Sequence, residues 1–221
     1  MASVAIDGPA GAGKSTIAKL VAKELNAIYV DTGAMYRAIA IYFLRNRLDP
    51  EIPEQVAEAC EQIEVTITYE DGNQQVWLNG ENVTPFLRTE EVGDMASRSS
   101  AKQAVRDKLL QLQRDLASSH KVVMDGRDIG THVLPEAEVK IYLTASSAER
   151  ARRRYEELTA RGEICDLAEI EQAIIERDQQ DMSRTIAPLK QAEDACYLDS
   201  SDLTIPEVVA WILEKCEEAA I

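Results

Sequence analysis

Short apolar runs alternate along the chain with longer stretches in which apolar residues recur every three or four positions. The short runs predict buried strands, at residues 3–6, 27–30, 122–124, 139–143 and 197–198. The longer stretches predict helices, around residues 17–25, 34–44 and 89–116, and after a capping box at Thr204 and Glu207. Residues 147–162 form a strongly charged run that is rich in arginine. Strands separated by helices imply parallel pairing with right-handed crossovers. The pattern therefore predicts an α/β fold, with a parallel sheet between two layers of helices.

One segment departs from this alternation. Residues 65–69 and 76–78 alternate between apolar and polar, and the turn-forming sequences 71–73 (DGN) and 79–80 (NG) follow them. We expect a small antiparallel hairpin or three-stranded sheet that is inserted between helices and ends near Val83. It is either a surface decoration or a mobile flap beside a substrate site, and the pattern does not distinguish the two.

The composition is that of an ordinary globular protein, with 221 residues of which 45% are hydrophobic and 29% are charged. A net charge of −15 repels nucleic acid and anionic membranes, so any anionic ligand needs a local cluster of cationic side chains and N–H groups. No apolar run is long enough to span a bilayer, and the first residues lack the pattern of a signal peptide. The four cysteines and two histidines are not at metal-ligand spacing. We expect reduced thiols, no structural zinc and a cytoplasmic protein.

A glycine-rich loop follows the first predicted strand. Residues 8–15 (GPAGAGKS) match GxxxxGK[ST], the phosphate-binding loop, with a strand before and a helix after it. Glycine lets such a backbone wrap a phosphate chain, and the N–H groups of residues 11–16 then point at it. We expect Lys14 to bridge the β- and γ-phosphates of ATP and Ser15 to ligate Mg²⁺. The expected ATP-binding residues of the loop are Gly8, Pro9, Ala10, Gly11, Ala12, Gly13, Lys14, Ser15 and Thr16.

The loop indicates a nucleoside triphosphate but not the reaction. The guanine-reading sequence NKxD is absent, which argues against a switch GTPase, and a motor or transporter ATPase would need a longer chain. A phosphotransferase needs a second anion pocket beside the first. Arginines near the ends of predicted strands are therefore the next signal to look for.

Two charged segments follow strands whose carboxyl ends should line a ligand crevice. Residues 31–37 (DTGAMYR) follow the second strand, and Arg37 faces either an acceptor phosphate or solvent. Asp125 ends the 122–124 run and resembles a Walker B carboxylate, which acts on Mg²⁺ directly or through water. Arg127 is hard to explain by packing, so this cluster predicts a functional site.

A third charged segment comes from a predicted helix late in the chain. Arg177, Asp181 and Arg184 are spaced i, i+4 and i+7, which places them on one stripe of that helix. The same spacing is typical of an ion-paired solvent face. Residues 185–188 (TIAP) follow Arg184, so we expect it near the helix end, where it can project into a cleft.

These motifs together resemble a bacterial-type cytidylate kinase. The matching pieces are IDGPAGAGKST (residues 6–16), DTGAMYR (31–37), DGRDIGT (125–131), KIYLTASSAERARRR (140–154) and RDQQDMSRTIAPL (177–189). They occur in the order of the family and span nearly the whole chain, and DGRDIGT is quite specific. The segment of inserted strands also matches the enlarged monophosphate-binding insert of the family.

The resemblance implies a role for each of these residues. The family's acceptor-phosphate ligands correspond to Arg37, Arg127 and Arg184, and its cytosine-reading residues to Ser97, Arg106 and Asp128. Arg177 and Asp181 would hold the ribose, Thr32 would complete the CMP site, and an arginine-rich lid with Arg154 would close over ATP. The implied catalytic residues are Lys14, Asp125, Arg127 and Arg184, with Mg²⁺ bound by Ser15 directly and by Asp125 directly or through water.

The resemblance implies a kinase that transfers the γ-phosphoryl group of ATP to CMP or dCMP in pyrimidine metabolism. It implies a single domain with a core (about 1–36, 84–148 and 165–221), an insert (about 37–83) and a lid (about 149–164). We expect a monomer that binds neither nucleic acid nor membrane. Two alternatives stay open: a kinase for another small acceptor (AMP, dTMP or a metabolite), and a slow NTPase switch.

Overall fold

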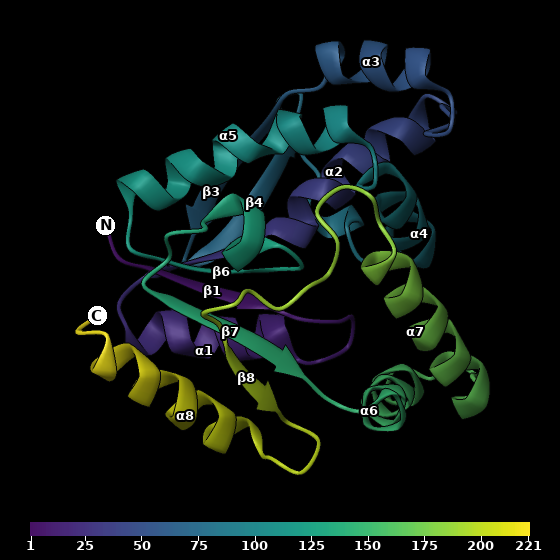
Figure 1. Cartoon of the computed structure of the whole chain (residues 1–221). Helices are drawn as coiled ribbons and strands as arrows, with labels where there is room; N and C mark the ends of the chain where they lie inside the picture. Colours follow the sequence, from purple (N-terminus) through teal and green to yellow (C-terminus); the bar gives the residue numbers. More distant parts are fainter.

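A five-stranded sheet forms the centre of the computed structural model, which describes residues 1–221 (Figure 1). Its strand order is β2-β6-β1-β7-β8, and every neighbouring pair is parallel. The strands are β1 (Ser3–Asp7), β2 (Ile28–Asp31), β6 (Val122–Gly126), β7 (Val139–Thr144) and β8 (Cys196–Asp199). All five match the apolar runs, and β1 and β6 are buried along their whole length, as strands covered on both faces are.

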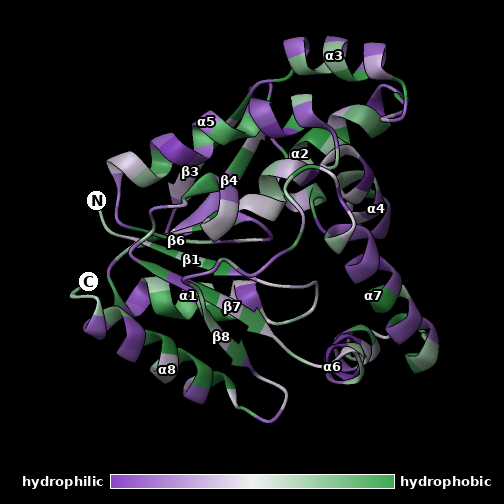
Figure 2. Ribbon diagram, viewed as in Figure 1, coloured by the Kyte–Doolittle hydropathy of each residue, from purple (hydrophilic) through white to green (hydrophobic).

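Helices cover both faces of this sheet. One face packs on α1 (Lys14–Glu24) and α8 (Ile205–Glu218), and the other packs on α2 (Thr32–Arg45) and α5 (Gln103–Ser119) (Figure 1). The capping box predicted at Thr204 is present at the start of α8. The three-layer α/β/α architecture is confirmed. Figure 2 shows largely hydrophobic strands in the central sheet and a largely hydrophilic α6 and α7, at residues Ser147–Ala160 and Leu167–Met182.

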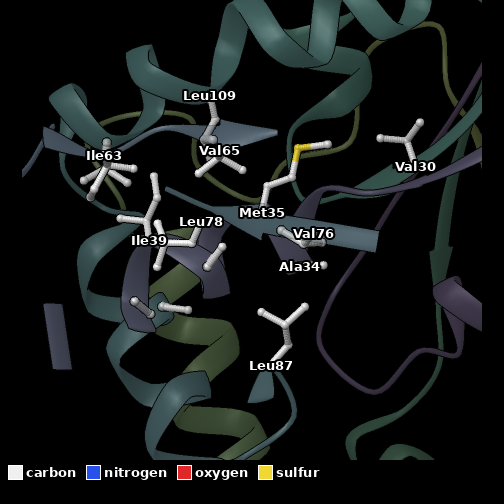
Figure 3. Close-up of a cluster of buried hydrophobic side chains, with 14 of the residues drawn as sticks. Val30, Ala34, Met35, Ile39, Ile63, Val65, Val76, Leu78, Leu87 and Leu109 are labelled. Atoms are coloured by element: carbon white, nitrogen blue, oxygen red, sulfur yellow. The ribbon is translucent and has the colours of Figure 1, made fainter. Parts of the chain in front are cut away.

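The predicted insert is a three-stranded antiparallel sheet. It consists of β3 (Val65–Glu70), β4 (Asn73–Leu78) and β5 (Glu81–Asn82), followed by the short helical turn η1 (Thr84–Phe86). Its apolar side chains pack against α2 and α5, and belong to the same hydrophobic core as the adjacent face of the central sheet (Figure 3). That shared core fixes the insert beside the end of β2.

The region predicted as one helix over 89–116 is two helices, α4 (Glu90–Ser99) and α5. The break at residues 100–102 follows a run of serines, and the hydroxyl of Ser100 bonds back to the carbonyl of Ser97 at 3.3 Å. Serine hydroxyls of this kind compete with the helical backbone, and Lys102 is extended. Helix α3 (Pro53–Gln62) was not among the predicted elements. No helix of the structure is both long and apolar enough to cross a membrane.

One prediction about α7 is wrong in part. Arg177 and Asp181 lie on this helix, but Arg184 does not, because α7 ends at Met182 and Ser183 caps it. The backbone then turns, with Ala187 at a φ of 45° ahead of Pro188. Arg184 therefore reaches Asp181 from a loop rather than from a shared helical stripe.

Candidate active site

The glycine-rich loop joins β1 to the first turn of α1. Gly13 caps the helix in the left-handed region, at a φ of 84°, so the first N–H groups of α1 point into the loop. At Gly8 a Cβ would lie 1.9 Å from the carbonyl oxygen of Leu143, so only glycine fits there. The buried ammonium of Lys14 donates a 2.7 Å hydrogen bond to the carbonyl of Pro9. Burial and the nearby charge of Arg127 lower the pKa of Lys14.

Asp125 is positioned at the carboxyl end of β6, beside the first turn of α1. Its Oδ2 accepts a 3.0 Å hydrogen bond from the hydroxyl of Ser15, and its Oδ1 accepts one of 2.8 Å from Tyr29. Burial, followed by the charge of Asp31, raises the pKa of Asp125. A hydroxyl and a carboxylate are the oxygen donors that Mg²⁺ takes from a protein when phosphates and water complete its shell, so this pair fits the ion.

Asp181 contacts two of the arginines that are predicted to bind the acceptor phosphate. Its Oδ2 accepts a 3.0 Å bond from Nε of Arg127, and its Oδ1 lies 2.6 Å from Nη2 of Arg184. The pKa of Arg177 is lowered, mainly by burial and then by the nearby positive charge of Arg127. Arg37 is half-buried, and desolvation lowers its pKa. Two guanidinium groups share a single buried carboxylate, which leaves net positive charge and favours an anionic ligand among them.

The residues predicted to read the base lie together behind this cluster. Arg106 and Asp128 form a buried ion pair, and Nη1 of Arg106 donates a 3.2 Å bond to the carbonyl of Ser100. The guanidinium also lies 5.4 Å from the ring centroid of Tyr36. Ser97 is linked to this pair through Ser100, whose hydroxyl donates a 3.3 Å bond to the Ser97 carbonyl. The same carbonyl accepts a 3.3 Å bond from Arg184.

Thr32 does not face this group through its hydroxyl, which donates a 2.8 Å bond to the buried carbonyl of Asp125. A cavity of about 240 Å³ opens between α2 and the insert, and both Asp31 and Arg37 line it. A larger hollow of about 520 Å³ lies between the turn Ile129–Val133 and residues 187–194. None of the predicted site residues lines that hollow, so we assign the site to the cluster of charged side chains around Asp181, next to the phosphate-binding loop.

The arginines of α6 divide into one buried residue and several exposed ones. Arg154, which the sequence places near ATP, is exposed and pairs with Glu157 at 2.8 Å. Arg150 is buried instead, and its Nη1 donates a 2.9 Å bond to the carbonyl of Ala10 in the phosphate-binding loop. The ATP contact of Arg154 stays a prediction.

Sequence reasoning missed two polar residues that shape the site. Asp7, at the end of β1, is buried and accepts 2.7 Å bonds from the N–H groups of Ile129 and Gly130. Gln74 of β4 makes two bonds to the backbone of Asp31, at 2.8 and 3.1 Å, and so ties the insert to the end of β2. Only Asp7 had a local signal, a carboxylate that directly follows a buried strand.

Comparison with known proteins agrees with this geometry. The model of the cytidylate kinase family matches residues 4–218. The chain belongs to the cytidylate kinase family. It is 49% identical over 212 residues to the cytidylate kinase of Caldicellulosiruptor bescii, covering 96% of this chain and 94% of that one. It is 46% identical over 217 residues to the cytidylate kinase of Bacillus cytotoxicus, covering 98% and 96%.

A solved structure has the same fold at low sequence identity. An uncharacterized protein from Eubacterium ventriosum superposes with a TM-score of 0.54 at 10% identity, over 98% of this chain and 99% of that one. This similarity concerns the fold alone. Membership in the cytidylate kinase family therefore rests on the sequence matches.

Proposed function

We propose that the protein transfers the γ-phosphoryl group of ATP to CMP or dCMP, giving ADP and CDP or dCDP. One observation carries the proposal. Arg127 and Arg184 converge on Asp181, and Arg127 lies near enough to Lys14 for its charge to lower the pKa of that lysine. The anion pocket and the ATP loop are thus adjacent, as transfer between two phosphate groups requires.

On the ATP side, the backbone of residues 8–16 would cradle the phosphates, and Lys14 would exchange its bond to Pro9 for phosphate oxygens. Ser15 would hold Mg²⁺ directly, and Asp125 directly or through water. When bound, this ion would neutralise charge that develops on the phosphates during transfer. Arg154 would reach ATP when the lid formed by α6 closes.

On the acceptor side, Arg37, Arg127 and Arg184 would bind the phosphate, and Arg177 and Asp181 would bind the ribose. The pair Arg106–Asp128 and Ser97 would read the cytosine edge. The hydrogen bond from Thr32 to the Asp125 carbonyl would hold the start of α2 against β6, between the CMP site and the Mg²⁺ site. Before CMP binds, the single charge of Asp181 offsets only part of the positive charge of Arg127 and Arg184. The doubly charged phosphate of CMP would supply the negative charge that is missing.

The transfer needs no general base, because the acceptor oxygen of CMP is already anionic. The bond between the γ-phosphorus and the bridging oxygen of ATP breaks, and a bond to the CMP phosphate oxygen forms. The side chains act by position and by positive charge: Lys14, Arg127 and Arg184 surround the transferring group and stabilise charge on it. We place this activity in the cytoplasmic metabolism of pyrimidine nucleotides, carried out by a monomer.

A panel of phosphoryl acceptors with ATP and Mg²⁺ tests the proposal. CMP and dCMP should be phosphorylated with the highest kcat/KM, ahead of UMP, AMP and dTMP. Faster turnover of AMP would refute the cytosine specificity, and ADP release that is unchanged by CMP would indicate a slow NTPase.

The variant Arg184→Met tests the acceptor pocket itself. Loss of one arginine at the transferring group should lower kcat by about 10³-fold. Arg45→Met is the control, since Arg45 forms an exposed ion pair with Glu81 away from the charged cluster around Asp181. Full activity in Arg184→Met would show that the pocket is assigned wrongly.

A further inference from the structure

Arg150 differs from the other arginines of α6 in the direction of its side chain. Its side chain is 6% exposed, whereas those of Arg152, Arg153, Arg154 and Arg161 are 29–55% exposed and pair with glutamates of the same helix. Arg150 makes no such pair. A guanidinium that is removed from water in this way needs an ionic partner and hydrogen-bond acceptors around it.

Three separate parts of the chain accept hydrogen bonds from the Arg150 guanidinium. Nε donates to the carbonyl of Ala145 at 2.9 Å, and Nη1 donates to the carbonyl of Ala10 at 2.9 Å. Nη2 donates to Oδ2 of Asp178 at 2.6 Å. Ala10 belongs to the phosphate-binding loop and Asp178 to α7, so one planar group joins the ATP loop to a helix of the acceptor pocket.

The loop lies close to Arg150 at Gly11. A Cβ at Gly11, which has a φ of 77°, would lie 3.4 Å from the Cβ of Arg150. The loop therefore passes directly against the buried side of α6, at the point where it would wrap the phosphates. A change in the path of the loop must displace the Arg150 side chain or its partners.

The partner of Arg150 on α7 is adjacent to residues of the proposed acceptor pocket. Asp178 directly follows Arg177 and lies one turn before Asp181, which holds Arg127 and Arg184. Helices α6 and α7 lie side by side (Figure 1). A second bond, from the Ser147 hydroxyl to Glu171 at 2.8 Å, joins the first turn of α6 to the first half of α7. Side-chain bonds thus hold the first two turns of α6 to two separate positions on α7.

We propose that Arg150 is a positioning residue that couples the two nucleotide sites through the contacts Ala10–Arg150–Asp178. The inference rests on the proposed function, because it takes the loop as the ATP site and α7 as part of the CMP site. The guanidinium is rigid and planar, so its three donors cannot adjust independently. Phosphates that accept bonds from the N–H groups of the loop would fix its backbone and hence the Ala10 carbonyl. Through Arg150 this would fix the orientation of Asp178, and with it Arg177 and Asp181. By reciprocity, CMP would strengthen the binding of ATP by the same factor.

The test measures the Kd of CMP with and without a β,γ-imido analogue of ATP. In the wild type the analogue should tighten CMP binding by at least about fivefold. In Arg150→Lys and in Asp178→Asn the ratio of the two Kd values should fall to near one. A lysine keeps the charge but cannot reach both partners with a planar fork. The double variant should show no further loss, because both changes break the same link.

Arg45→Lys is the matched control, since its bidentate ion pair with Glu81 joins α2 to β5 and touches neither nucleotide site. It should keep the wild-type ratio of Kd values. If Arg150→Lys and Asp178→Asn weaken the binding of both nucleotides but retain the wild-type ratio of Kd values, the Arg150–Asp178 ion pair is only structural. The proposal is then overturned.

Amide hydrogen exchange separates this proposal from the proposed function. The ATP analogue alone should slow exchange at residues 177–182 in the wild type and not in Arg150→Lys. That measurement needs no acceptor. If the wild type does not bind CMP, the cytidylate assignment is refuted, and hydrogen exchange still tests the link between the loop and α7. Equal protection in both proteins would overturn the coupling.

Discussion

The Ser15 hydroxyl donates a 3.0 Å hydrogen bond to Oδ2 of Asp125, and so joins the first turn of α1 to the end of β6. Tyr29 occupies the other carboxylate oxygen at 2.8 Å. The carboxylate is 5% exposed, and burial raises its pKa. A divalent cation beside these two oxygens would favour the ionised carboxylate and would replace the hydroxyl proton as its partner.

Asp125→Asn should therefore lower kcat by about 100-fold and increase the Mg²⁺ concentration needed for half of the maximal rate. The asparagine fills the same space but lacks the charge that attracts the ion. Steady-state rates with CMP over a Mg²⁺ titration give both quantities.

Tyr29→Phe is the control for Asp125→Asn, because it removes a hydrogen bond to the same carboxylate and leaves the charge in place. We expect its Mg²⁺ dependence to match that of the wild type. An unchanged Mg²⁺ dependence in Asp125→Asn would contradict the assignment of this carboxylate to the ion.

Lys14 should take up a proton when ATP binds. Burial and Arg127 lower the pKa of its ammonium group in the free protein. The phosphates of ATP add negative charge beside it, which favours the charged form and raises the pKa. Calorimetry without Mg²⁺ at about pH 8, in buffers that differ in ionisation enthalpy, measures the proton uptake. Lys14→Arg should show none, because arginine stays charged, and equal uptake in both proteins would exclude Lys14 as the source.

The elements with a strong local pattern were predictable, and those with a weak one were not. Helix α3 buries only Val56 and Ala59, so its apolar stripe is too short to detect. Strands β1 and β6 at the centre of the sheet are buried on both faces and are apolar runs in the sequence. The insert was predictable because turn-forming residues separate its strands, and its place beside β2 was not, because that depends on Gln74 and Asp31, far apart in sequence.

The same distinction holds for the site. The phosphate-binding loop is a local motif, and its geometry follows from its glycines. The sequence did not distinguish Arg150 from the arginines beside it. Which arginine of this charged helix turns inward depends on the groups that α7 and the loop place opposite it. Arg106 and Asp128 were assigned through family resemblance, and the structure shows a buried ion pair that neither local sequence indicates.

That ion pair predicts an asymmetric effect of substitutions on stability. Asp128→Ala should lower the free energy of unfolding by about 3–5 kcal/mol, because it leaves the buried charge of Arg106 without a partner. Adding Arg106→Met to that variant should recover part of the loss, since no charge then remains buried. Urea unfolding measures both. A double variant less stable than Asp128→Ala would show that Arg106 is satisfied without Asp128.

Asp7 predicts how the stability of the protein depends on pH. Burial raises the pKa of this carboxyl to about 7, from 3.8, although two backbone N–H groups favour its charged form. A raised pKa in the folded state means that the stability contributed by Asp7 is full below pH 3.8. It is lost as the pH rises through about 7. The wild type should therefore lose free energy of unfolding relative to Asp7→Asn between about pH 5 and 7, by up to about 1.4 kcal/mol per pH unit.

Asp194→Asn is the control for this titration. Asp194 is exposed, and its hydrogen bond with Lys140 lowers its pKa, so its contribution is lost only as the pH falls through acid values. Urea unfolding of all three proteins between about pH 5 and 8 should thus give a sloping difference for Asp7→Asn and a flat one for Asp194→Asn. A flat difference for Asp7→Asn would mean that the two N–H groups of residues 129 and 130 stabilise the carboxylate enough to offset its burial. Asp7 would then hold that turn as an ion throughout the physiological range.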